Sequence, residues 1–113
     1  MRSKRVHEAE IRRLFNEGRY YERMKAGEFR AYIVRQKLVT GGDRRIRGTT
    51  SETVEYVDNH GNFVARVHQF RWPNGMLGAS GRPDPKALWH EGVMYRLRTD
   101  EDWDIMPWDA DER

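Results

Sequence analysis

The strongest chemical signal in the sequence is a mixture of cations and aromatic side chains in the first half of the chain. Arg30, Tyr32 and Arg35 lie close together, and Tyr20 lies among arginines in the preceding segment. Arginine binds phosphate through two donors, and aromatic rings stack on nucleic-acid bases. The pattern predicts that these four residues contact RNA or DNA. Tyr20 and Tyr32 would equally suit a core between a helix and a sheet.

A second basic cluster, Arg44, Arg45 and Arg47, lies within the glycine-rich segment 40–51. Such a segment is typical of a loop. Arginines in a loop are not needed for packing, and a loop can follow a phosphate backbone. We therefore expect these three arginines to make the first phosphate contacts.

A catalytic alternative involves Arg66, His68 and Arg96. The first two share one face of a predicted strand, and Arg96 lies on a possible neighbour. Metal-independent RNA cleavage needs a base of near-neutral pKa and a cation for the charge on phosphorus, and these residues supply both types. They would also form an ordinary half-exposed strand face whose long side chains cover apolar surface. The sequence favours that second interpretation and hence a protein that is not an enzyme.

The C-terminal segment 99–113 has seven acidic residues and contains Trp103 and Trp108. Tryptophan is a frequent interface anchor, so these two residues predict contact with a protein partner. The acids around them can also mimic a nucleic-acid backbone or occupy the protein's own basic surface. Alternatively, both tryptophans cap the core.

Composition and charge exclude several classes of protein. The chain has 113 residues, 21 Lys and Arg, 18 Asp and Glu, and no Cys, which excludes disulfides, cysteine-ligated zinc and thiol catalysis. The four histidines have no metal-ligand spacing, so we expect neither a metal site nor a cofactor. With no apolar run of about 20 residues and no signal peptide, we expect no membrane contact and a cytoplasmic location. Charge is uneven, because residues 1–47 hold fourteen of the 21 cations.

Hydrophobic periodicity predicts the elements that position these residues. Residues 3–26 form a helix that Gly18 can divide in two. Residues 28–39 form a strand that is apolar on both faces, as in a central strand. Residues 52–72 form a β-hairpin around a turn at 58–62.

The last part of the domain is predicted as a loop, a short helix and a strand. Asp84 and Pro85 resemble an N-cap and first helical position, ahead of a helix over residues 86–90. Residues 93–98 form the last strand. The expected fold is α+β, with an N-terminal helix packed on one face of a roughly four-stranded antiparallel sheet. Residues 1–98 are expected to form one domain, followed by the acidic tail 99–113.

Three stretches, 61–69, 78–86 and 92–95, resemble small bacterial and phage-type proteins without an assigned function. The resemblance covers about residues 52–96. The order of helix and antiparallel sheet is also similar to small ribonuclease toxins of the ribosome-dependent type. That resemblance implies chemistry on basic and aromatic residues of the sheet and of the C-terminal segment.

Three hypotheses follow from the sequence. The first is a small basic, non-enzymatic module that contacts nucleic-acid phosphates. The second is an accessory or inhibitor protein of bacterial or phage type that binds a protein partner through its acidic tryptophan tail. The third is a small metal-independent ribonuclease.

Overall fold

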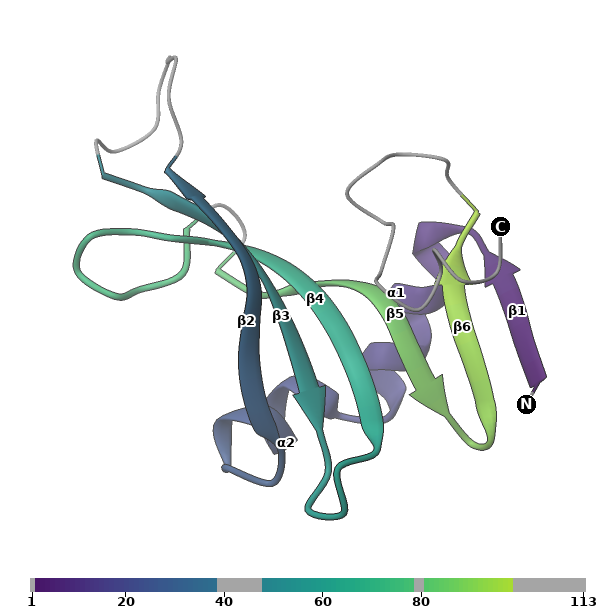
Figure 1. Cartoon of the computed structure of the whole chain (residues 1–113). Helices are drawn as coiled ribbons and strands as arrows, with labels where there is room; N and C mark the ends of the chain where they lie inside the picture. The colour runs from purple at the N-terminus through teal and green to yellow at the C-terminus, as the bar shows by residue number, and fades with distance from the viewer. Residues whose placement is uncertain (1, 39–47, 79–80, 99–113) are drawn as a thin grey trace.

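The computed structural model describes residues 2–38, 48–78 and 81–98. Within those ranges the backbone forms two α-helices and six β-strands (Figure 1). In chain order they are β1 (Arg2–Val6), α1 (Glu8–Glu17), α2 (Tyr20–Lys25), β2 (Arg30–Leu38), β3 (Thr50–Val57), β4 (Phe63–Arg71), β5 (Asp84–His90) and β6 (Val93–Leu97). The fold class is α+β, as the sequence predicts.

All six described strands belong to one mixed sheet, in the order β1-β6-β5-β4-β3-β2. β1 pairs with β6 in parallel, and the other neighbouring strands pair antiparallel. The prediction of about four antiparallel strands is therefore wrong in number and in direction. Strands β1 and β5 are the two that the sequence pattern does not predict.

Strand β1 occupies residues that were expected to begin the helix over 3–26. The helix begins only after His7, whose Nδ1 accepts a hydrogen bond from the backbone N–H of Ala9 at 3.2 Å. Before this cap, Val6 packs against the core and its carbonyl accepts a hydrogen bond from the N–H of Arg98 at 3.0 Å. The basic residues ahead of Val6 have no apolar helical face to bury, so they pair with β6 instead.

Strand β5 replaces the short helix predicted over residues 86–90. Ala87 and Leu88 are both buried although they point to opposite faces, which suits a strand inside a sheet. The register with β4 shifts beside Pro85. At such a bulge the missing N–H of proline costs no ladder hydrogen bond. The Asp84–Pro85 pair therefore begins a strand as readily as a helix.

The predicted hairpin is confirmed as β3 and β4. In its turn, the Asp58 carboxylate accepts hydrogen bonds from the backbone N–H groups of Asn62 at 2.9 Å and His60 at 2.8 Å. The hydrogen bond from Asn62 is the largest effect on the pKa of Asp58 and lowers it; burial opposes this, but the bond from His60 adds to the lowering and the net pKa is below its ordinary value. Gly61 has a φ of 84°, a conformation that favours glycine. The two other strands expected from the sequence are confirmed as β2 and β6.

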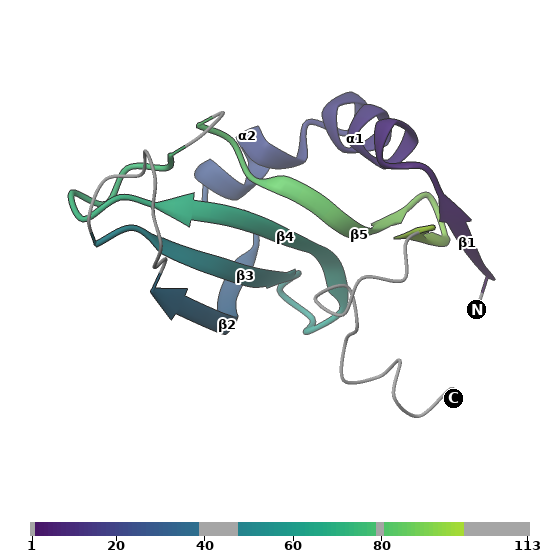
Figure 2. The same ribbon diagram turned by 90° about the horizontal axis from the view of Figure 1, so that it is seen from above.

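Both helices lie on the same face of the sheet (Figure 2). The core fills the space between them and the sheet. Its buried residues are Ile11, Leu14, Phe15, Tyr20, Met24, Val54, Val64, Ala65, Val67, Leu88 and Leu97. In the described part of the chain, the opposite face of the sheet carries no helix.

Gly18 divides the predicted helix into α1 and α2, as the sequence suggests, but for a more specific reason than helix propensity. A Cβ at this position would overlap the ring of Tyr20. That ring is buried, and its hydroxyl lies 2.8 Å from Nδ1 of His90. The ring must therefore lie against a residue without a side chain.

We predict that Gly18→Ala lowers the melting temperature by several degrees. Helix propensity alone would favour Ala by about 1 kcal/mol, but overpacking a core ring costs about 1–3 kcal/mol. Thermal unfolding followed by circular dichroism measures the balance. In a Tyr20→Ala background, where the ring is absent, the same substitution should cost nothing. A higher melting temperature for the single variant would contradict this explanation.

Candidate nucleic-acid interface

One face of the sheet points away from both helices, and we call it the helix-free face (Figure 2). Val54 and Tyr56 of β3 pack in the core. Because side chains alternate along a strand, Thr53 and Glu55 point the other way. Directly opposed residues on neighbouring strands point to the same side, so the register identifies the remaining members. The helix-free face comprises Arg30, Tyr32, Arg35, Lys37, Ser51, Thr53, Glu55, Arg66, His68, Phe70, Asp84, Ala87, Trp89, Met94, Arg96, Ser3 and Arg5.

Strand β2 is the outermost strand on one side of the sheet, and all nine of its residues are exposed. The expectation of a central strand is therefore wrong. Arg35 and Lys37 place charge on this edge, which discourages pairing with other chains. The apolar residues that suggested a central position, Ile33 and Val34 among them, are exposed instead.

A bulge at Val34 decides which β2 side chains share a face. Tyr32 opposes Glu55, and the register then shifts so that Arg35 opposes Thr53. Simple alternation would place Tyr32 and Arg35 on opposite faces. Because of the bulge, both point to the helix-free face, with Arg30 before them and Lys37 after them. The structure thus brings together three of the predicted contact residues and adds Lys37.

A single row of side chains crosses all six strands of the sheet. From β2 to β1 the register reads Tyr32, Glu55, Arg66, Ala87, Arg96 and Arg5. Neighbouring strands are about 4.8 Å apart. Arg66 and Arg96, both named in the catalytic hypothesis, are therefore about 10 Å apart on one face. Apart from Glu55, the charged members of this row are arginines.

Arg66 is the most buried cation of the helix-free face. It is 5% exposed, and its guanidinium lies 3.4 Å from the carboxylate of Glu55. Burial raises the pKa of Glu55, and the charge of Arg66 partly opposes that rise. Because the pair is net neutral, the exposed positive charge of the face comes mainly from its other cations.

His68 lies two residues along β4 from Arg66, on the same face. Its Nε2 is 2.7 Å from Oγ of Ser51, and the Phe70 ring packs edge-on with a centroid separation of 4.9 Å. The sequence pattern predicts a loop up to Ser51, so this residue was not expected at the site. The extension of β3 to Thr50 places Ser51 within reach of the histidine.

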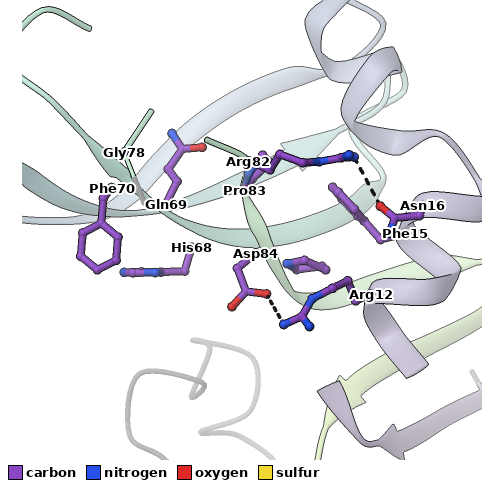
Figure 3. Close-up of a pocket in the computed structure, with 11 residues that line it drawn as sticks. Arg12, Phe15, Asn16, His68, Gln69, Phe70, Gly78, Arg82, Pro83 and Asp84 are labelled. Atoms are coloured by element: carbon purple, nitrogen blue, oxygen red, sulfur yellow. Dashed lines mark hydrogen bonds and ion pairs between the residues drawn. The ribbon is translucent and has the colours of Figure 1, made fainter. Parts of the chain in front are cut away.

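His68 also lines a pocket of about 460 Å³ between the end of α1 and the start of β5 (Figure 3). Two arginines from outside the sheet lie at this pocket. Arg12 is 3.4 Å from the Asp84 carboxylate, and Arg82 is 4.0 Å from the Glu22 carboxylate. Because each cation already has a carboxylate partner, the pocket is less suited to binding an anion than the exposed cations of β2.

The remaining predicted contact residues lie elsewhere. Tyr20 is buried on the helix side of the sheet, where it stacks on Phe15 and Phe29, so we leave it out of the candidate interface. Arg44, Arg45 and Arg47 lie outside the described residues, as do Trp103 and Trp108.

Comparison with known proteins gives no relative: no family model, curated protein or solved structure matches the chain. In the described ranges, the structure contains no helix that is long and apolar enough to cross a membrane. The candidate interface therefore depends on the geometry of the chain itself.

Proposed function

We propose that the protein binds single-stranded nucleic acid across the helix-free face. The observation that supports this most directly is the bulge at Val34, which aligns Arg30, Tyr32, Arg35 and Lys37 on one exposed edge. Cations on both sides of a ring can hold successive phosphates while the ring stacks on a base. Tyr32 is 48% exposed, so its ring is accessible for stacking.

The surface continues from β2 to β4. Lys37 opposes Ser51, which opposes Phe70. Likewise, Arg35 opposes Thr53, which opposes His68. Strand β4 lies about 10 Å from β2. A polynucleotide that crosses the sheet therefore passes from the cations and the single ring of β2 to the two rings of His68 and Phe70 on β4.

A sheet face of this kind suits a single strand better than a duplex. Proteins that read duplex DNA insert a helix or a two-stranded ribbon into a groove. Single strands instead expose bases that stack on aromatic side chains of a sheet. The helix-free face offers rings and cations, and both described helices lie behind it. Neither type of contact requires a 2′-hydroxyl, so we expect binding to both RNA and DNA.

The test is a fluorescence anisotropy titration with a labelled single-stranded RNA and the matching DNA. We predict that Arg35→Gln/Lys37→Gln weakens binding roughly tenfold at low salt, because each lost phosphate contact also removes a counterion that binding would release. The slope of log K against log salt should become shallower by about 1.4, or about 0.7 for each single-strand phosphate contact.

The matched control is Arg13→Gln/Lys25→Gln, which removes the same charge from the exposed surface of the two helices. This pair should leave both affinity and slope close to those of the wild type. Equal losses for the two pairs would show that only net charge matters and would refute the proposed face. Absence of salt-sensitive binding by the wild type would refute nucleic-acid binding itself.

The Ser51–His68 contact supports a second candidate function, metal-independent cleavage of RNA. His68 could take the proton of a 2′-hydroxyl, with Arg66 as the nearest cation on the same strand face. The same titration distinguishes this function from binding. Anisotropy that falls with time at substoichiometric protein in EDTA indicates cleavage, whereas a stable increase indicates binding.

A further inference from the structure

Part of the helix-free face is buried and apolar where β5 and β6 pair, and Trp89, which opposes Met94 on this face, is 36% exposed. Ala87 and Met94 are only 2% and 5% exposed, and Arg66 is equally inaccessible. All three point away from the helices, and Ala87 and Met94 are not members of the main core cluster. Among the described residues, both helices lie on the other side of the sheet. This apolar floor with arginines beside it therefore suits an additional covering segment.

The chemistry of that covering segment can be inferred from the charges around the floor. Ala87 lies between Arg66 and Arg96 in the row that crosses the sheet, and Arg5 follows Arg96. A complementary segment would place an apolar side chain over Ala87 and Met94 and carboxylates over the arginines.

The C-terminal segment 99–113 has this composition. It carries seven acidic residues and one arginine, and Asp102 and Asp104 flank Trp103. A large aromatic ring is the side chain that most often anchors such contacts.

The position and length of the segment also fit. It follows β6, which ends at Leu97, directly after Arg96 of the row. From β6 to β2 is four strand spacings, or about 19 Å. Fifteen extended residues span about 50 Å. The segment thus begins at the rim of the helix-free face and is long enough to cross it.

We propose that the acidic segment 99–113 docks in cis on the helix-free face, with Trp103 over Ala87 and Met94. Asp102 and Asp104 then face Arg66 and Arg96. The docked segment occupies the surface that nucleic acid would use, so it competes with nucleic acid as an internal mimic. This competition rests on the proposed function, whereas the docking does not.

Docking is tested in the full chain, which contains no Cys and therefore accepts a single nitroxide label. A label at Ala110→Cys should broaden the methyl resonances of Ala87 and Met94 more than those of Ile11 and Leu14 on the helix side. High salt should reverse the broadening, because it screens exposed charge pairs. The same label at Glu17→Cys on α1 should instead broaden the methyl resonances of Ile11 and Leu14 more than those of Ala87 and Met94. If the methyl resonances on both faces remain equally sharp with the label at residue 110, the docking proposal is overturned.

Competition is tested by neutralising the two acids beside Trp103. Asp102→Asn/Asp104→Asn should strengthen RNA binding roughly fivefold at low salt. The control Glu17→Gln/Glu91→Gln changes the net charge equally at exposed sites elsewhere. Equal gains for both pairs would overturn competition while leaving the docking result intact. If no variant binds RNA, the proposed function fails, and the label experiment still decides the docking.

Discussion

Replacing Glu52 with Gln should lower the free energy of unfolding by about 3 kcal/mol at pH 7. The carboxylate is 1% exposed and accepts hydrogen bonds from Gln36 Nε2 at 2.8 Å, Gln69 Nε2 at 3.0 Å and Arg71 Nε at 3.1 Å. An amide has only one oxygen and would turn its NH₂ group toward at least one of these donors. Because Gln36 lies on β2, the substitution also weakens the attachment of the strand that carries the candidate interface.

The loss of stability caused by Glu52→Gln should depend on pH. Burial raises the pKa of Glu52, but the hydrogen bonds from Gln69, Arg71 and Gln36 and the charge of Arg71 together outweigh burial. The net result is a pKa below the ordinary value of 4.5. Such a group stabilises the fold above its unfolded pKa, and the stabilisation is lost as pH falls through the folded pKa. Urea unfolding should therefore show the full difference from wild type at pH 7 and a shrinking difference below pH 4.5.

Glu55→Gln is the matched control on the same strand. Burial raises the pKa of Glu55, and Arg66 opposes this only in part. The folded protein then retains this proton to higher pH than the unfolded chain, so the wild type loses stability relative to the variant as pH rises. The two variants should differ from wild type with pH trends of opposite sign. Parallel trends would contradict the environments assigned to these carboxylates.

The parts of the fold that the sequence predicted correctly are those with local determinants. The turn of the β3–β4 hairpin is encoded by Asp58, Asn62 and Gly61, which form its hydrogen bonds and supply its positive φ. Strand β6 has alternating apolar residues that indicate a strand without knowledge of its neighbours. These signals lie within a few residues of the structure that they specify.

The errors arise where pairing is decided by distant residues. Strand β1 has no apolar alternation and is defined by its partner β6, more than 80 residues away in the sequence. The Asp84–Pro85 pair fits a helix start or a strand bulge, and the register with β4 decides between them. The residue pattern of one segment does not show which distant strand it pairs with, or in which register.

The same limit applies to the candidate interface. The sequence identified Arg30, Tyr32 and Arg35 by residue type, but strict alternation would separate them onto two faces. The bulge at Val34 reunites them, and only the pairing with β3 reveals that bulge. Tyr20 shows the converse, because its arginine neighbours suggested a surface role while Gly18 makes room for its ring in the core.

Replacing Tyr32 with Ala should weaken binding of single-stranded nucleic acid by about 1–3 kcal/mol, or roughly five- to 150-fold. The ring is half exposed on an edge strand, so its removal should leave the fold intact. Stacking involves no counterion release. The slope of log K against log salt should therefore match that of the wild type, in contrast to the shallower slope of Arg35→Gln/Lys37→Gln.

Two neighbouring variants test whether the loss belongs to the ring and to its face. Tyr32→Phe keeps the ring but removes the hydroxyl, whose hydrogen bond with Arg30 raises the pKa of that guanidinium; it should retain most of the affinity. Ile33→Ala removes a side chain that is 55% exposed on the same strand but points to the other face, and it should bind like the wild type. If Ile33→Ala loses as much affinity as Tyr32→Ala, the strand is needed only as an intact edge and the assignment of the helix-free face fails. If only Tyr32→Ala is weakened, with an unchanged salt slope, the contact is base stacking on the face that the Val34 bulge creates.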